Sequence, residues 1–426
     1  MYLCTKTRSL RGDEKHILTS RFPVITAVNQ NMMKKILLIV AMAMINTLHG
    51  ICGKHYTVVL SLDGYRWDYT EWYNTPFMDM MAEKGVKSGL IPSYPSKTFP
   101  NHYTLATGLY PDNHGIVANS FLDQTTNETY SLSNYKQKMN PRYYGGEPIW
   151  NTAKKQGIST AVFYWPGSDV GIEGMYPDTY YIYDKEPRLT MQERLDGIIG
   201  MLRLPEDKRP QLIMGYMEEP DGCGHNFGPH DKKTRKMVEK LDSMLSSFYM
   251  KIQNLPFADD INLIVLSDHG MTWIEEGNAV DITTRLKDTW IKKIEGSIPA
   301  HIYVNKGCVD SVFNALKGID NARVWRKADI PARLHYGKNK RVGDIIVDPD
   351  LGFIISDKPV HKGGSHGFDP AQSDMHALFR ATGPDFRNIE VSHFPNVNVY
   401  PLLCRLLGIK PATNDGNMMV TSKILQ

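Results

Sequence analysis

The chain has 426 residues, of which 42% are hydrophobic and 22% charged, with a formal net charge of +3. This balance is ordinary for a globular protein and excludes disordered, coiled-coil and collagen-like chains. The positive excess lies in the first fifty residues, which hold seven basic and two acidic side chains, so the rest carries a net charge of −2. A slightly acidic body lacks the basic surface that long nucleic acid requires, although metal ions can neutralise the phosphates of a nucleotide.

The one long apolar run near the start, residues 36–45, follows two lysines and precedes small or polar residues. It is too short to span a bilayer but has the layout of a secretory signal peptide. We therefore expect a leader of doubtful status at 1–32, a signal peptide at 33–52, and export to the periplasm or extracellular space without a transmembrane span. Cys52 could accept a lipid, but Ile51 replaces the small residue usual before a lipidated cysteine, so lipid anchoring is not the expected form.

Three segments share one pattern, a short apolar run that ends in an acidic residue. They are residues 56–63, 212–221 and 261–268. Near-continuous apolar runs of this length are typical of strands that are buried on both faces of a largely parallel sheet. Further strands are predicted at 159–163 and 376–381.

Helical patterns fall between these runs, most clearly at 232–252, where apolar residues recur at helical spacing. Strands that alternate with helices predict an α/β fold with a largely parallel central sheet and helices on both faces. From about 280 to 355 the pattern changes to short strands around one helix at 308–316. We interpret this stretch as a small α+β insertion within a catalytic domain that spans 53–426.

Acidic and imidazole side chains follow the predicted strands. Asp63, Asp221, Asp268 and His269 all stand at carboxyl ends, where ligands bind in open α/β sheets. A single aspartate in this position more often caps a turn or a helix. Three in the same context, accompanied by histidines, favour one shared site.

The same residues have the chemistry of metal ligands. Asp221 and His225 are four residues apart and can reach one ion, and His366 lies in a glycine-rich segment that can bend sharply. Carboxylate and imidazole ligands without thiolate suit Zn²⁺ first, with Mn²⁺ or Co²⁺ as substitutes. Cys223 lies between Asp221 and His225, but these two residues already provide metal ligands. A thiolate ligand is therefore not expected.

Thr98 is the candidate nucleophile. It stands just before a predicted helix at 101–108, where free backbone N–H groups favour an anion. A hydroxyl is a poor nucleophile near neutral pH unless a base or a metal lowers its pKa. The alternative is that Thr98 only caps this helix.

Seven motifs follow one another along the chain, and their ordered set is far more specific than any one of them. They are Ser61-Leu-Asp-Gly-Tyr-Arg, Lys97-Thr-Phe-Pro-Asn-His-Tyr, Thr107-Gly-Leu-Tyr-Pro-Asp-Asn-His-Gly-Ile, Tyr164-Trp-Pro-Gly-Ser-Asp, Glu218-Glu-Pro-Asp-Gly-Cys-Gly-His, Ser267-Asp-His-Gly-Met and Gly364-Ser-His-Gly-Phe-Asp. From about residue 54 onward the chain resembles the nucleotide pyrophosphatase/phosphodiesterase family of the alkaline-phosphatase superfamily, as a secreted member of bacterial type.

The resemblance implies an alkaline-phosphatase-like fold and two zinc ions per chain. One ion would be held by Asp63, Thr98, Asp268 and His269, and the other by Asp221, His225 and His366. It implies hydrolysis of phosphodiester and pyrophosphate bonds of nucleotides to nucleoside 5′-monophosphates, through a covalent phosphoryl-threonine intermediate. Because all seven groups are present, a catalytically dead relative is not expected.

The resemblance also implies substrate contacts. Asn119 matches a donor to the phosphate oxygens, although it could instead close a turn. Phe99 and Tyr183 match aromatic side chains that stack on the base, and Trp165 could line the same slot. Lys138 matches a lysine that can reach the distal phosphate.

Four alternative functions differ in the residues that they would require. A sulfatase needs a convertible Cys or Ser and an Arg, which Lys97-Thr-Phe-Pro-Asn lacks, and an alkaline-phosphatase-type monoesterase needs a Ser and ligands for a third metal. A lipid or choline phosphodiester hydrolase of the same family would share every metal ligand. An exported binding protein would need no nucleophile.

Overall fold

The computed structural model describes Lys35 and residues 55–426, so the expected leader, the signal peptide and Cys52 lie outside the described residues. Within the described part, no helix is both long enough and apolar enough to cross a membrane.

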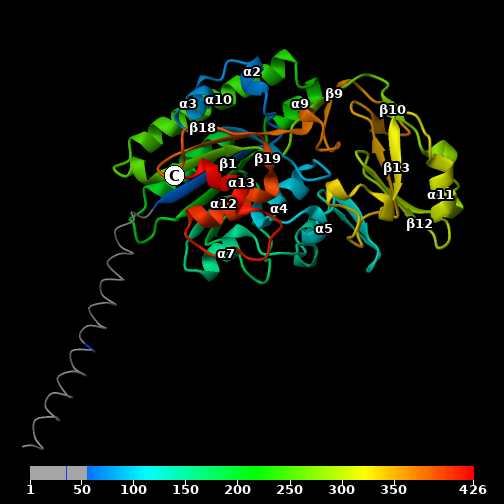
Figure 1. Ribbon diagram of the computed structural model, residues 1–426, viewed down its shortest axis with the longest axis horizontal. Helices are drawn as coiled ribbons and strands as arrows, with labels where there is room; N and C mark the ends of the chain where they lie inside the picture. The colour runs from blue at the N-terminus through cyan, green and yellow to red at the C-terminus, as the bar shows by residue number, and fades with distance from the viewer. Residues whose placement is uncertain (1–34, 36–54) are drawn as a thin grey trace, which may run out of the picture. The chain divides into compact units, whose positions relative to one another are not determined.

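A nine-stranded sheet forms the centre of the part that spans 55–426 (Figure 1). Its strands run in the order β18-β2-β17-β8-β1-β7-β5-β6, and β19 also pairs with β2. Their bounds are β1 (Tyr56–Leu62), β2 (Val86–Ile91), β5 (Thr160–Phe163), β6 (Thr179–Tyr180), β7 (Leu212–Met217), β8 (Ile261–Leu266), β17 (Ala377–Thr382), β18 (Ile389–Glu390) and β19 (Phe394–Pro395). All neighbours pair in parallel except β17, which is antiparallel to β8 and β2. The predicted largely parallel sheet is confirmed.

Helices cover both faces of this sheet, as predicted. Along β1, Val58 and Leu60 pack into one apolar cluster and Val59 into the other, because successive side chains of a strand point to opposite faces. The first cluster includes residues of α3 (Pro76–Lys84), α8 (Met191–Leu202) and α10 (Lys232–Gln253). The second includes residues of α4 (Thr98–Thr107), α7 (Ile149–Lys155) and α12 (Val399–Leu406). In Figure 1, α3 and α10 accordingly lie above the sheet, and α4, α7 and α12 lie below it.

One predicted helix boundary is wrong. We expected a helix at 101–108 with Thr98 outside it, but α4 begins at Thr98 and its N-cap is Lys97. Pro100 explains the error: a proline suggests a break, yet the first turn tolerates it because those N–H groups have no partner within the helix. Thr98 therefore lies in the first turn of the helix.

Shorter elements connect the sheet to the loops around the site. The helices are α2 (Tyr69–Trp72), α5 (Pro111–His114), α6 (Tyr135–Lys138), α9 (Asp221–Phe227) and α13 (Met418–Thr421), and the strand pairs are β3 (Ser120–Asp123) with β4 (Glu128–Ser131) and β9 (Thr272–Ile274) with β16 (Gly363–Ser365).

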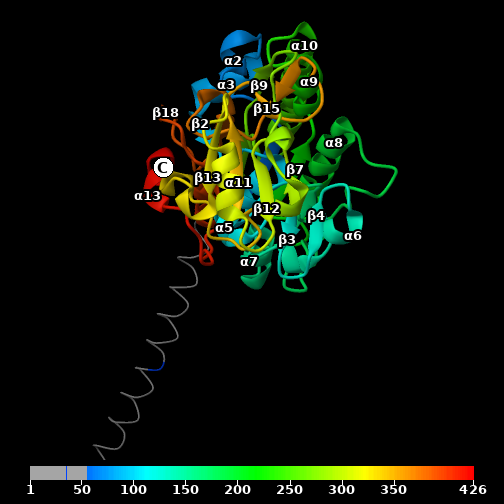
Figure 2. The ribbon, with the colours of Figure 1, turned by 90° about the vertical axis from the view of Figure 1, so that its right-hand side faces the viewer.

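The insertion is a small α+β unit with its own apolar cluster. Four antiparallel strands run in the order β11-β12-β14-β13, with bounds Ile291–Glu295, Ala300–Val304, Ile345–Pro349 and Ala322–Arg326, respectively. The helix α11 (Val309–Leu316) packs on them, and β10 (Ala279–Val280) pairs with β15 (Ile354–Ile355). Figure 2 looks onto this unit, with α11, β12 and β13 in front. Sequence patterns missed β11 because Lys292 and Lys293 interrupt its apolar run.

A buried carboxyl group in this unit lies against the loop that leads to Thr98. Asp348, in β14, accepts a 2.9 Å hydrogen bond from the hydroxyl of Tyr94, and its Oδ2 has no hydrogen-bond partner among the described residues. Burial raises the pKa of Asp348 to about 7, and Arg323 and the Tyr94 hydroxyl only partly offset this effect.

We expect Asp348 to make the folded protein less stable as pH rises from about 4 to about 7. The folded pKa lies above the ordinary value near 4, so the folded state holds the proton more tightly and loses that advantage as the unfolded chain ionises. The loss is on the order of 2–4 kcal/mol and is complete above pH 7. The free energy of unfolding, measured with urea at pH 5 and at pH 8, should differ less between the two pH values for Asp348→Asn than for the wild type. Asp350→Asn, at a more exposed position, is the control, and parallel pH profiles of the Asp348 variant and the wild type would contradict this expectation.

Candidate metal centre and active site

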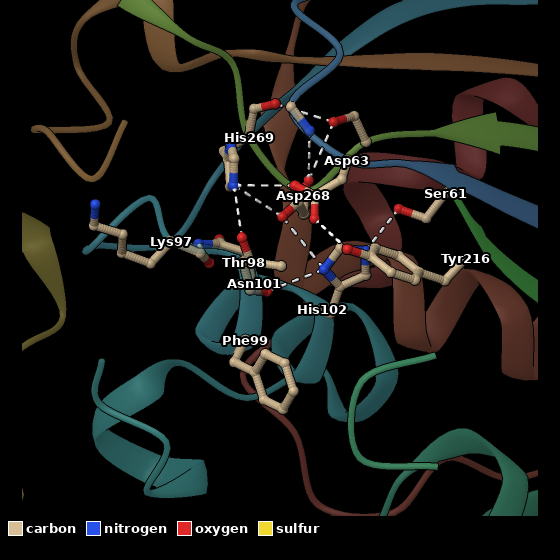
Figure 3. A network of polar contacts seen from close by, with 12 residues as sticks. Ser61, Asp63, Lys97, Thr98, Phe99, Asn101, His102, Tyr216, Asp268 and His269 are labelled. Carbon is tan, nitrogen blue, oxygen red and sulfur yellow. Dashed lines mark hydrogen bonds and ion pairs between the residues drawn. The ribbon is translucent and has the colours of Figure 1, made fainter. Parts of the chain in front are cut away.

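All seven predicted metal-binding residues gather at one end of the sheet. Asp63 follows β1, Asp268 and His269 follow β8, and Asp221 begins α9 just after β7. His225 lies one turn later on α9, His366 follows β16, and Thr98 begins α4. Figure 3 shows Thr98, Asp63, Asp268 and His269 pointing toward one another from different parts of the chain.

Glycines allow two of these segments to meet. A Cβ at Gly363 would come within 2.4 Å of the His225 carbonyl oxygen, and one at Gly364 within 2.4 Å of the Gly224 carbonyl oxygen. Only glycine therefore lets the backbone of β16 approach α9 closely enough to place His366 beside His225. The predicted use of this glycine-rich segment has a direct steric basis.

Asp221, His225 and His366 form the first of two compact groups of ligand atoms. In each of these two groups the atoms lie within 4.8 Å of one another. The Asp221 Oδ1 atom is 3.5 Å from His225 Nε2 and 3.7 Å from His366 Nε2. The two Nε2 atoms are 3.1 Å apart.

The second group is Asp63, Asp221 and His269, so Asp221 belongs to both. His269 Nε2 lies 3.4 Å from Asp63 Oδ1 and 3.1 Å from Asp268 Oδ2. Thr98 Oγ1 lies 3.2 Å from the same nitrogen. The structure thus brings Asp63, Asp268, His269 and Thr98 together, with Asp221 between them and the other two histidines.

The hydrogen bonds of the histidines show that lone pairs face the centre. The Nδ1 atoms of His225, His269 and His366 lie 2.8–2.9 Å from the backbone carbonyls of Gly364, Gly270 and Ser96, respectively. A carbonyl can only accept, so each Nδ1 carries the proton and, in the neutral ring, each Nε2 carries a lone pair. This second contact of the ring is typical of metal-binding histidines.

The carboxylates repeat this pattern. Asp63 Oδ1, Asp221 Oδ1 and Asp268 Oδ2 are buried and have no hydrogen-bond donor among the described residues. Oxygen atoms of three carboxylates and Nε2 atoms of three imidazoles therefore face one another over short distances. Acceptors gathered so closely favour a cation between them, and the residues present fit one or two metal ions.

The electrostatics support the same interpretation. Burial, together with Asp268 and Asp221, raises the pKa of Asp63 well above its ordinary value. Burial and the neighbouring His269 lower the pKa of His366, which keeps its imidazole neutral, as a metal ligand must be. Without a cation, the carboxylates repel one another in a buried space.

The hydroxyl of Thr98 has no capping role. The N-cap of α4 is Lys97, and the Lys97 side chain makes no capping hydrogen bond. Thr98 Oγ1 instead contacts His269 and lines a cavity that also contains Asp63 and Asp221. The helix N-terminus adds partial positive charge beside this hydroxyl.

Sequence patterns missed several residues that hold the site. His102 is fully buried one helical turn after Thr98, with Nδ1 3.3 Å from Asp268 Oδ2 and Nε2 2.8 Å from Ser61 Oγ. Tyr216 donates a 2.6 Å hydrogen bond to Asp63 Oδ2 (Figure 3). The four-residue spacing of Thr98 and His102 could have indicated the first of these, whereas Tyr216 is indistinguishable from a core residue of β7.

Lys97 is a further missed residue. Its Nζ donates a 2.5 Å hydrogen bond to the carbonyl of His366, so it holds the loop that carries this histidine. Burial lowers the pKa of Lys97 to about 8, although nearby Asp221 opposes the shift.

Four of the five predicted substrate-binding residues share one cavity of about 270 Å³ beside Thr98. Phe99, Trp165, Tyr183 and Lys138 all line it. Trp165 is only 1% exposed and donates a 3.0 Å hydrogen bond to the His102 carbonyl, so it mainly supports α4. Lys138 is buried, not solvated, and forms an ion pair with Asp184.

Asn119 lies at the edge of this arrangement. Its Oδ1 accepts a 3.2 Å hydrogen bond from the backbone N–H of Phe99, at the start of α4. This contact orients the amide, and no described residue accepts from its Nδ2. The side chain therefore bonds to the helix that carries Thr98 and keeps two donor hydrogens for a ligand.

The described cysteines do not contribute to the site. Cys223, Cys308 and Cys404 form no disulfide with one another. Burial raises the pKa of Cys223 to about 11, and Glu219 adds to the effect, so it stays a thiol rather than a thiolate ligand.

Comparison with known proteins agrees with this geometry. Residues 57–369 match the family model described as type I phosphodiesterase/nucleotide pyrophosphatase. The chain is 36% identical to human ectonucleotide pyrophosphatase/phosphodiesterase family member 1 over 84% of its length, and 35% identical to the venom phosphodiesterase CdcPDE of Crotalus durissus collilineatus over the same share. It spans only 40% and 45% of the lengths of these two relatives.

Solved structures with the same fold are also found. Human ectonucleotide pyrophosphatase/phosphodiesterase 5 superposes with a TM-score of 0.83 and 32% sequence identity. The superposition covers 87% of this chain and 100% of the human chain. An inactive threonine-to-alanine variant of the murine protein, in complex with AMP, superposes with a TM-score of 0.82 and 31% identity over the same shares. The family match, the two relatives and these structures together place the chain: it belongs to the type I phosphodiesterase/nucleotide pyrophosphatase family, with an alkaline-phosphatase-like fold.

Proposed function

We propose that the protein is an exported, zinc-dependent phosphodiesterase and nucleotide pyrophosphatase that releases nucleoside 5′-monophosphates through a phosphorylated Thr98. The observation that carries this proposal is the convergence of carboxylate and imidazole side chains on a threonine hydroxyl, beside a cavity with aromatic walls. The catalytic domain would be 53–426, with the insertion at about 280–355, after a signal peptide at 33–52. Export is supported by relatives that are named as ectoenzymes or as a venom enzyme.

Two ions fit the donor set. Asp63, Asp268 and His269, with Thr98, would hold one, and Asp221, His225 and His366 would hold the other. Carboxylate and imidazole donors suit Zn²⁺, with Mn²⁺ or Co²⁺ as substitutes. When bound, such ions supply positive charge beside the Thr98 hydroxyl and the phosphate oxygens, which lowers the pKa of the hydroxyl and stabilises developing charge.

In the proposed reaction Thr98 Oγ attacks phosphorus in line. The Oγ–P bond forms, the bond from phosphorus to the leaving oxygen breaks, and the leaving group departs with the electron pair and takes up a proton. Water then attacks the same phosphorus from the side opposite Thr98 Oγ. The P–Oγ bond breaks, the monophosphate leaves, and the threonine hydroxyl is restored.

Other residues of the chain orient these groups. The Nδ2 of Asn119 would donate to a phosphate oxygen, and loss of one such donor costs about 10²–10³ in rate. Tyr216 holds Asp63, and His102 contacts Asp268 while it bonds to the backbone of Thr98. These contacts fix the ligand side chains before substrate arrives.

A pair of chromogenic substrates tests the proposal. The p-nitrophenyl ester of thymidine 5′-monophosphate should be hydrolysed much faster than p-nitrophenyl phosphate, because only the diester offers a nucleoside to the cavity. No turnover of either substrate in added zinc would instead indicate a binding protein. Faster cleavage of the monoester would indicate a phosphatase.

The aromatic walls of the cavity predict which mutations change substrate binding. Phe99→Ala or Tyr183→Ala should raise KM for nucleotide substrates by about tenfold or more, since stacking of one base is worth about 1–3 kcal/mol. KM for bis(p-nitrophenyl) phosphate should change less, because this diester carries no base. Steady-state kinetics on both substrates measure the effect, and equal changes would count against a stacking slot.

A choline or lipid phosphodiester hydrolase would use the same metal ligands. Lys138 lines the cavity as an ion pair with Asp184, so the kinetics and not the charge of the lining separate the two candidates. Faster hydrolysis of glycerophosphocholine than of nucleotide substrates would replace the nucleotide proposal with this one.

A further inference from the structure

Three charged side chains line the cavity beside Thr98 in addition to the predicted metal-binding residues. They are Lys138, Asp169 and Asp184. All three lie around Tyr183, on whose ring a base is proposed to stack. The Lys138 Nζ atom is 6.0 Å from the centroid of this ring. The backbone N–H of Tyr183 donates a 3.3 Å hydrogen bond to Asp169 Oδ2, and Asp184 is the next residue along the chain.

Lys138 is the unusual group among these charges, because it is a buried lysine with a single partner. It is 7% exposed, and its ammonium forms an ion pair with Asp184 Oδ2. No other residue of the described part accepts a hydrogen bond from this ammonium. Because an ammonium has three N–H groups, donors remain for a ligand. Buried donors without partners are costly, so a ligand that accepts from Lys138 is favoured.

Asp184 offers acceptors beside this ammonium. Its side chain is 34% exposed, and its Oδ1 atom has no hydrogen-bond partner among the described residues. Burial raises the pKa of Asp169, and the nearby charges of Lys138 and Asp184 lower it and raise it, respectively. The three groups are therefore close to one another, and together they provide the cavity with two carboxylates and one ammonium.

The four common bases differ in the donors and acceptors of their Watson–Crick edges. A base that is stacked on aromatic side chains is read by hydrogen bonds to this edge. Guanine offers two donor groups, N1–H and N2–H₂, beside one acceptor, O6. Adenine offers one donor group and one acceptor, and uracil and cytosine offer one donor group and two acceptors. Guanine is thus the base whose edge matches two carboxylates and one ammonium.

We propose that the cavity prefers guanine nucleotides and that Asp184 determines this preference, an inference that rests on the proposed nucleotide substrate. Asp184 accepts from N1–H and N2–H₂ of a guanine that is stacked on Tyr183, and the ammonium of Lys138 donates to O6. The negative charge of Asp169 opposes the additional acceptor oxygen of a pyrimidine.

Steady-state kinetics of the zinc-loaded protein with GTP, ITP, ATP and UTP test this preference. The four substrates carry the same triphosphate, so any contact with the distal phosphates cancels between them. ITP differs from GTP only in the missing N2 amino group. Its kcat/KM should be lower than that of GTP by about tenfold or more, because a hydrogen bond to a charged acceptor is lost. ATP and UTP should fall below GTP by at least the same factor.

Two variants assign the preference to its residue. Asp184→Ala, at a partly exposed position, should bring kcat/KM for GTP to within about threefold of that for ATP. Glu186→Gln removes a negative charge two residues later, on a side chain that does not line the cavity, and should preserve the preference for GTP.

The same data separate this inference from the proposed function. Equal kcat/KM for all four nucleotides would overturn the guanine preference but leave nucleotide hydrolysis in place. So would a preference for GTP that Asp184→Ala leaves intact, or an effect of Asp184→Ala that is equal for all four. No hydrolysis of any nucleotide would contradict the proposed function, and the guanine preference with it. The ratio of GTP to ITP in the wild type decides without any mutation.

Discussion

Replacement of Thr98 by alanine is expected to lower kcat for the p-nitrophenyl ester of thymidine 5′-monophosphate by at least about 10³-fold. The variant keeps the two groups of carboxylates and imidazoles but loses the hydroxyl oxygen that is proposed to attack phosphorus. Water in its place would lack the positioning of a side chain held at the start of α4. Stopped assays with purified wild-type and variant protein measure the effect.

Two controls separate loss of the nucleophile from loss of the site. Thr98→Ala should retain a metal content and a Tm near those of the wild type, and Thr98→Ser should keep part of the activity because it keeps the hydroxyl. Full activity of Thr98→Ala would remove this residue from its proposed role.

Removal of the metal ions is expected to have an effect on activity of similar size. Treatment with a chelator should lower turnover by about 10³-fold or more, and added Zn²⁺ should restore it. The Tm should fall as well, because the clustered carboxylates of Asp63, Asp221 and Asp268 then repel one another. A ligand at a thousand times its Kd stabilises the folded state by about 4 kcal/mol, so the change in Tm is measurable by calorimetry.

The stability measurement adds information that activity does not. A chelated protein that is inactive but keeps its full Tm would mean that the metal ions are not held by this buried set. Substitution of the partly buried Cys308, which lies far from the ligands in the sequence, should leave both the activity and the chelator response unchanged.

The sheet could be predicted from the sequence because its central strands are buried on both faces. Every residue of β1, β7 and β8 is buried, so the apolar runs are continuous and their ends are marked by aspartates. Edge elements carry weaker patterns. β11 has lysines in its middle, and the pairing of β9 with β16 depends on glycines whose role appears only when α9 is seen beside them.

The chemistry of the site was predictable and its supports were not. Carboxylates, imidazoles and a threonine in motifs identify themselves by residue type and order along the chain. His102 and Tyr216 act through contacts with Asp268 and Asp63 that join distant segments. Only the spacing of His102 from Thr98 gives a local signal, and nothing in the sequence distinguishes Tyr216 from a core residue. The burial of Lys138 against Asp184 likewise has no local signal in the sequence.

Anomalous X-ray scattering at the zinc edge, from crystals of the active protein, tests the central claim most directly. Two peaks are predicted, one beside Asp63, Thr98, Asp268 and His269, and one beside Asp221, His225 and His366. An active protein whose crystals show no metal at these side chains would contradict it.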